Sequence, residues 1–150
     1  MSIMPATPRF SLPLLTTAQA QKEVTHNEAL TLIDALIQPS VEAGPQDAPP
    51  ADPDEGQCWL VGDAPTGDWA GRAQAIAVWT AGGWRFAAPR EAMRAWRIAD
   101  GAWLRFEGGI WVAPSPVAEP SGGSIVDSEA RAAIGTLILL LEAHGILMSG

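Results

Sequence analysis

The sequence predicts an α+β protein in which a small antiparallel β module lies between two helical segments. Three tryptophan-rich hairpin patterns occur between residues 78 and 112, with one helical pattern before them and one after. Each hairpin pattern carries Gly-Gly or Asp-Gly at its turn. These pairs supply the positive φ angles of tight hairpin turns, and aromatic residues suit a pleated, half-buried surface.

The N-terminal region predicts an extended arm followed by a helix. Residues 1–15 contain three prolines and no periodic pattern. Thr16 and Gln19 match the capping-box pattern, and the helix is expected to continue to Gln38, just before Pro39. Its last two turns are apolar over more than half of the circumference, so we expect burial on several sides. The residues expected at an oligomer interface are Leu30, Ile33 and Ile37.

A proline-rich linker and the β module follow. Residues 43–56 hold four prolines among acids and alanines, which predicts a stiff connection without core residues. The β module is expected within residues 57–113. Its predicted strands are 57–61, 76–79, 84–86, 93–98, 103–106 and 110–112.

A second linker and a final helix complete the predicted organisation. Its segments are 1–42 (arm and helix), 43–56 (linker), 57–113 (β module), 114–124 (linker) and 125–150 (C-terminal helix). Asp127 is the predicted N-cap of a helix from Ser128 to His144, and Gly145 is the predicted C′ residue.

The final helix has the seam of a coiled coil. Its apolar residues recur at alternating spacings of four and three, and others widen the stripe. Such a helix behind a linker needs a partner, either its own β module or the same helix of a neighbouring subunit, and we favour the neighbour. The expected interface residues are Ile134, Leu137, Ile138 and Leu141.

Composition limits the partners. The chain has 150 residues and a formal charge of −8, which disfavours nucleic acid and anionic membranes as partners. Only the β module is not acidic, with six arginines and five acids in residues 57–113. The single cysteine allows no intrachain disulfide. The N-terminus lacks the pattern of a signal peptide, so we expect assembly in the cytoplasm.

We expect neither enzymatic activity nor a cofactor or metal. His26 and His144 lie in no motif that would pair a nucleophile with a base. With Cys58 they make no plausible zinc set. The glycine pairs lack the lysine or the strand-to-helix spacing of a nucleotide-binding loop. Acids that could cleave a glycosidic bond all lie at or beside turns, where acids are common, namely Asp63, Asp68, Glu91, Asp100 and Glu107.

The seven tryptophans are the best candidates for binding. Exposed indole rings can stack on the C–H faces of sugars, and neighbouring arginines can pair with carboxylates of an acidic polysaccharide. For most of them we favour a place in the core or a subunit interface. Trp69 lies in a loop between Gly67 and Gly71, so Trp69 and Arg72 are the candidate glycan contacts.

Several motifs resemble one known family. They are residues 7–13 (TPRFSLP), 18–30 (AQAQKEVTHNEAL), 56–59 (GQCW), 67–71 (GDWAG), 83–86 (GWRF) and 89–93 (PREAM). The sequence is similar to a family of formally unknown function that occurs in phages, prophages and gene transfer agents of alphaproteobacteria. The similarity covers about residues 7–113, and the C-terminal helix resembles a tail that such proteins often carry.

The resemblance implies a virion component, the base or adaptor of a head spike or fibre, which anchors the part that adsorbs to host capsule. It implies a homo-oligomer, three- or five-fold, that also binds a capsid or vertex protein and a distal spike or fibre protein. It assigns no catalytic residues. The alternative is a carbohydrate-binding module that contacts capsular polysaccharide directly, and a polysaccharide-cleaving enzyme ranks last.

Overall fold

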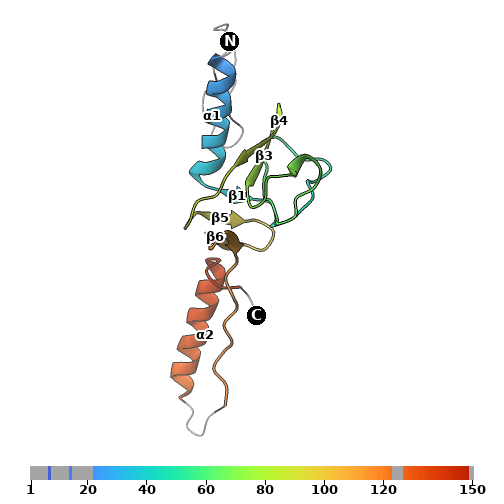
Figure 1. Cartoon of the computed structure of the whole chain (residues 1–150). Helices are drawn as coiled ribbons and strands as arrows, with labels where there is room; N and C mark the ends of the chain where they lie inside the picture. The colour runs from blue at the N-terminus through green and yellow to red at the C-terminus, as the bar shows by residue number, and fades with distance from the viewer. Residues whose placement is uncertain (1–6, 8–13, 15–21, 123–126, 149–150) are drawn as a thin grey trace.

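The computed structural model describes residues 7, 14, 22–122 and 127–148. Within these residues it confirms the α+β class, with helices α1 (Lys22–Ile37) and α2 (Ser128–Ala143) and a β module between them in the chain. The two helices project from opposite ends of the β module, which makes the molecule elongated (Figure 1). Each helix therefore has a long side that faces away from the sheets.

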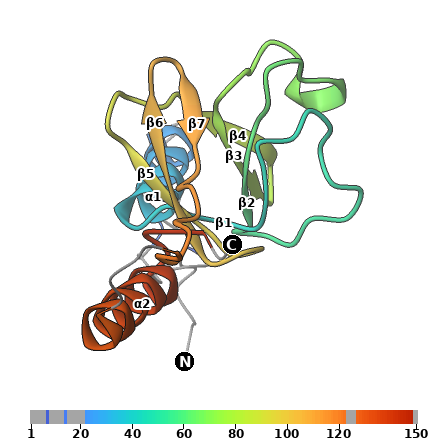
Figure 2. The same cartoon turned by 90° about the horizontal axis from the view of Figure 1, so that it is seen from below.

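The β module contains two sheets that stand side by side (Figure 2). One is antiparallel and has the order β2 (Cys58–Leu60), β3 (Ile76–Thr80), β4 (Gly83–Ala87). The other has the order β1 (Ser40–Val41), β5 (Arg94–Arg97), β6 (Ala102–Glu107), β7 (Ile110–Val112). Each of the six strands predicted from sequence corresponds to one of β2 to β7.

The strand that the sequence did not predict is β1. It pairs in parallel with β5, and Trp96 N–H donates to the Pro39 carbonyl at 2.8 Å. The start of the segment predicted as a linker bonds to β2 instead, because Leu60 N–H donates to the Ala43 carbonyl and Gln46 N–H to the Leu60 carbonyl, each at 3.1 Å. Two residues between a helix and a proline-rich stretch carry no alternation that would reveal a strand.

The sheet β2–β3–β4 separates two cores. Alternate residues of its strands point to opposite faces, as in any strand. One face contributes to a core shared with α1 and the second sheet, whose members are Ala35, Val41, Cys58, Leu60, Ile76, Val78, Ala95, Ala102, Leu104 and Trp111. The other face carries a smaller core that consists of Trp59, Val61, Trp69, Ala75 and Ala77.

Helix α1 contacts the β module along one side only. Ala35 is fully buried in the shared core and Leu36 packs against it. Asp34 is fully buried as well, whereas Ile33 and Ile37 remain 48% and 57% exposed, so one stripe of this helix is left open. The predicted cap at Thr16 and Gln19 lies outside the described residues.

Helix α2 is attached to the β module at its C-terminal end. The predicted N-cap is confirmed, since Asp127 Oδ1 accepts a hydrogen bond of 2.8 Å from Ala130 N–H. The predicted C′ residue is confirmed as well, because Gly145 has φ +65° directly after the C-cap. The Gly145 carbonyl accepts a hydrogen bond of 3.0 Å from Trp103 N–H, and Met148 packs against the shared core.

The rest of α2 extends away from the sheets. The segment 114–122 runs back beside it (Figure 1), and Arg131 Nη1 donates to the Pro120 carbonyl at 3.0 Å. Within α2, every residue of which is described, Ile138 is the one buried side chain. The end of α2 is thus fixed while its length stays free for other contacts.

The close packing around Gly145 generates a testable prediction. A Cβ at Gly145 would lie 2.5 Å from the Gly101 carbonyl oxygen and 2.5 Å from the Trp96 ring. We expect Gly145→Ala to lower the free energy of unfolding by about 3 kcal/mol, through left-handed backbone strain and overpacking together. Chemical denaturation measures it.

Gly108 provides the matched control for this substitution. It has a similar φ of +59°, but nothing lies within 4 Å of the position that a Cβ would take there. Gly108→Ala should cost only about 1 kcal/mol, from backbone strain alone. Equal losses in the two variants would show that the end of α2 is not seated as described.

Candidate functional site

The first candidate surface is an apolar stripe along the outward side of α1. Leu30, Ile33 and Ile37 follow one another at spacings of three and four residues, which places them on one face of the helix. Leu30 is half-buried, whereas Ile33 and Ile37 are about half exposed. The structure therefore brings these three predicted interface residues together on a surface that one copy of the chain leaves open.

The second candidate surface is the corresponding stripe of α2. Ile134, Leu137 and Leu141 are 43%, 58% and 39% exposed. Ile138 departs from the prediction, because it is only 8% exposed and is buried by its own chain. It lies on the flank of the predicted seam, so the chain covers this flank and leaves the seam itself open.

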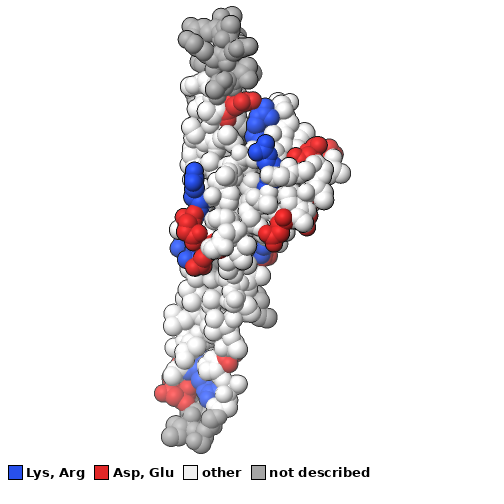
Figure 3. Space-filling model, in the orientation of Figure 1, with Lys and Arg blue, Asp and Glu red and all other residues white. Residues whose placement is uncertain are grey.

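The charge distribution agrees with the α2 stripe. In the space-filling view, Lys, Arg, Asp and Glu gather over the β module and near the N-terminal end of α2, while the α2 surface between them shows no charge (Figure 3). An exposed apolar patch without charged neighbours is more typical of an interaction surface than of a helix face that stays in contact with water. This arrangement suits contacts between protein surfaces.

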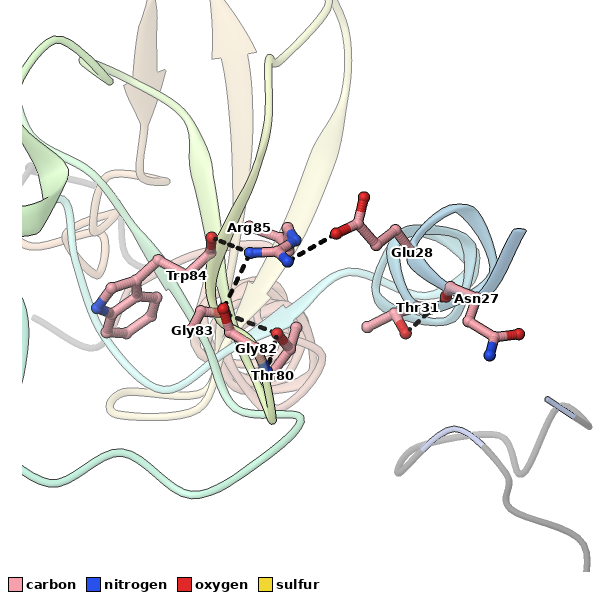
Figure 4. Close-up of polar contacts among 8 residues, drawn as sticks. All are labelled: Asn27, Glu28, Thr31, Thr80, Gly82, Gly83, Trp84 and Arg85. Atoms are coloured by element: carbon pink, nitrogen blue, oxygen red, sulfur yellow. Dashed lines mark hydrogen bonds and ion pairs between the residues drawn. The ribbon is translucent and has the colours of Figure 1, made fainter. Parts of the chain in front are cut away.

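A polar contact fixes α1 against the hairpin of β3 and β4. Arg85 Nη2 donates to Glu28 Oε1 at 2.7 Å, and Arg85 Nη1 donates to the Trp84 carbonyl at 3.0 Å and the Gly82 carbonyl at 3.3 Å (Figure 4). The two side chains are 32% and 44% exposed, so water screens the pair and its contribution is below about 1 kcal/mol. Its role is mainly to orient the helix.

Trp84 points to the opposite face of β4 and forms the centre of a tryptophan cluster. Its ring meets Trp59 at 5.6 Å, Trp69 at 5.1 Å and Trp79 at 5.0 Å between centroids, each time edge to face. These are favourable geometries for aromatic pairs. Three of the motifs quoted above, GQCW, GDWAG and GWRF, each contribute one ring to this cluster.

Trp69 corrects a prediction. Its glycine-flanked loop predicts a ring open to solvent, yet the side chain is fully buried. The flanking Gly67 and Gly71 both have positive φ, and the short 3-10 helix η1 (Gly67–Trp69) turns the ring inward against Trp84. A buried ring offers no face to a sugar. The prediction that the Trp69 ring is exposed, on which the glycan contact depended, is therefore wrong.

Arg72, the other candidate glycan contact, remains at the surface. Its guanidinium carbon lies 5.1 Å from the centroid of the Phe86 ring, a cation–π contact that covers the edge of the tryptophan cluster. The two candidate residues therefore do not form one exposed site, because Arg72 is exposed and Trp69 is buried. No sequence signal distinguishes a glycine-flanked loop that turns inward from one that faces solvent.

Two carboxyl groups have lowered pKa values. Hydrogen bonds from Arg97, at 2.7 Å and 2.5 Å, lower the pKa of Asp100 against an opposing effect of burial. The backbone N–H of Glu129 and the Ser128 hydroxyl lower the pKa of Glu129. Such groups stabilise the fold fully above their ordinary pKa and lose that contribution as the pH falls through the lowered value. Both stabilise local structure, at a turn and at a helix start.

Shallow pockets lie on the described surface. One of about 250 Å³ lies between β5, β6 and the end of α2, and one of about 240 Å³ lies between α1 and the β3–β4 turn. A third, of about 350 Å³, lies between the proline-rich segment and Trp79 and Trp84. Within the described ranges, no group of three His, Cys, Asp or Glu residues could hold a metal, and no helix is long and apolar enough to span a membrane.

The two faces of β4 generate a prediction. Trp84→Ala should lower the free energy of unfolding by about 3 kcal/mol, because it removes a ring that contacts three others. The neighbouring substitution Arg85→Ala should cost less than about 1 kcal/mol. Urea denaturation, followed by near-ultraviolet circular dichroism, measures both. A larger loss for Arg85→Ala would show that the ion pair, not the cluster, holds the sheet.

Comparison with known proteins places the chain in a family. No curated protein matches it. Residues 26–112 match the model of a family described as a protein of unknown function, DUF2793. The match runs from the second turn of α1 to the end of β7 and includes the tryptophan cluster and the Glu28–Arg85 pair. Because it covers more than half of the sequence, the chain belongs to the DUF2793 family.

Proposed function

We propose that the protein is a structural component of a phage or gene transfer agent particle, the base or adaptor of a head spike or fibre. The observation that carries an assembly role is the pair of exposed apolar stripes on helices at opposite ends of the β module. The virion setting comes from the sequence resemblance described above. In this proposal the protein anchors the part that adsorbs to host capsule and performs no catalysis.

The α2 stripe is the proposed contact between copies of the chain. Ile134, Leu137 and Leu141 repeat with the spacing of a coiled-coil seam. Fully burying an exposed side chain of this size contributes roughly 1.5–3 kcal/mol. These three are about half exposed, so each would contribute about half of that in an assembly. The proposed symmetry is three- or five-fold, which are closed arrangements of identical contacts.

The α1 stripe is the proposed contact at the other end. Ile33 and Ile37 would pack on sister subunits and on a capsid or vertex protein. The bundled α2 helices would then hold the distal spike or fibre protein. Because both sheets and both cores lie between the two helices, the β module serves as a rigid spacer between the contacts. In this proposal assembly takes place in the bacterial cytoplasm, and the protein ends on the particle exterior.

This proposal predicts that one charge on the α2 stripe dissociates the oligomer. Leu137→Glu in the full-length chain should convert a homo-oligomer into monomers, because assembly would bury an unpaired carboxylate. Native mass spectrometry measures the change. Thr136→Glu is the matched control, since this exposed neighbour points to a different face and should leave the oligomer intact.

Other outcomes of this experiment are equally informative. Ile37→Glu should preserve the α2-mediated oligomer, and its loss in that variant alone would assign assembly to α1. A wild-type chain that stays monomeric at high concentration would contradict the adaptor role altogether.

A further inference from the structure

The pocket beside the end of α2 has a composition unlike the rest of the surface. It lies on the face of β5 and β6 that points away from the shared core, and it measures about 250 Å³. Its lining combines two arginines, one tryptophan and aliphatic walls, namely Arg94, Arg105, Trp103, Leu104, Val112, Pro114, Gly145 and Ile146. Neither the expected glycan contacts nor the apolar stripes belong to it.

The two arginines lie side by side on neighbouring strands of the sheet. Arg94 and Arg105 are direct partners in the antiparallel pairing of β5 and β6, which places both guanidinium groups on one face. Directly opposed like charges destabilise a sheet unless an anion lies between them. Arg105 pairs with Glu107, whereas the described residues provide no ion pair for Arg94. The pocket therefore has a cationic group available to an incoming anion.

The remaining walls are aromatic and aliphatic. The half-buried Trp103 forms one side, and its ring meets Trp96 edge to face at 5.3 Å. Val112 and Ile146 are 40% and 53% exposed and contribute apolar surface. A ligand that fits this pocket must combine an anionic group with a compact body that has an apolar face.

The pocket is held in shape by the seat of α2. The hydrogen bond from Trp103 N–H to the Gly145 carbonyl, 3.0 Å long, joins the tryptophan wall to the helix end. Gly145 lies so close to Gly101 and Trp96 that no side chain fits there. Binding therefore requires little reorganisation of these walls, which favours affinity.

We propose that this pocket binds an acidic saccharide, one hexuronate unit of a polysaccharide chain. The guanidinium of Arg94 pairs with the sugar carboxylate, because its planar fork matches carboxylate geometry. The indole of Trp103 packs against the C–H face of the sugar ring. Pockets for drug-sized ligands measure about 300–1,000 Å³, so this smaller pocket suits a single ring.

An acidic peptide is the weaker candidate for the same charges. An aspartate or glutamate side chain reaches an arginine through a flexible stem and has no flat face for Trp103. The saccharide uses both the charge and the ring, which is why we choose it. This inference is independent of the adaptor proposal, because a particle component can assemble with or without a sugar site.

The test is binding of a galacturonic acid hexamer to the full-length protein, measured by isothermal titration calorimetry and tryptophan fluorescence. Arg94→Gln should weaken binding about tenfold or more, because it removes a charge-assisted hydrogen bond pair. Arg94 is exposed and unpaired within the described residues, so this variant should melt like the wild type. Arg90→Gln, an exposed arginine that does not line the pocket, should bind as the wild type does.

Three further binding measurements complete the test. Arg94→Lys keeps the charge but loses the planar fork and should weaken binding several-fold. A neutral galactose hexamer should bind at least tenfold more weakly than the acidic one, and a glutamate hexapeptide should also bind more weakly. Equal binding of acidic and neutral sugars, equal or tighter binding of the peptide, or no effect of Arg94→Gln would each overturn the proposal.

Discussion

Strand β4 is the part of the molecule on which the other elements depend, because its two faces serve different neighbours. On one face Trp84 contacts three other tryptophan rings and closes the smaller core. On the other face Arg85 reaches Glu28 and orients α1. The two contacts contribute differently to the free energy of unfolding. The packed rings contribute most of the stability, whereas the half-exposed ion pair contributes little and mainly orients α1. Together with Ala35 and Leu36 in the shared core, this contact sets the direction of the N-terminal helix.

Burial is divided unevenly between the β module and the helices. The sheets bury most of their large side chains within one copy of the chain, whereas Ile33, Ile37 and Leu137 remain about half exposed. A protein that folds as an isolated unit gains little from such surfaces and risks aggregation. The arrangement is consistent with a module that folds by itself and helices that complete their burial in an assembly.

Sequence reasoning predicted this fold where local chemistry determines structure. Glycine-bearing turns located β3 to β7, and Asp127 and Gly145 marked the ends of the last helix, because caps and turns depend on nearby residues. It failed where distant residues decide. Residues 40 and 41 form the strand β1 because they pair with β5, which lies more than fifty residues later in the chain. Trp69 is buried because its ring packs against that of Trp84. The spacing of α2 predicted its open stripe but not the covering of Ile138.

The attachment of α2 has consequences at two scales. A helix anchored by its side would use its apolar face within its own chain, but α2 is anchored at its C-terminal end through Gly145 and Met148. Its seam therefore remains open along its length. The same attachment places Gly145 and Ile146 over β6, where they enclose the pocket with Arg94 and Trp103. The tight seat of Gly145 thus belongs both to the attachment of the projecting helix and to the pocket wall. The proposed assembly and the proposed saccharide binding therefore share a structural origin while using different residues.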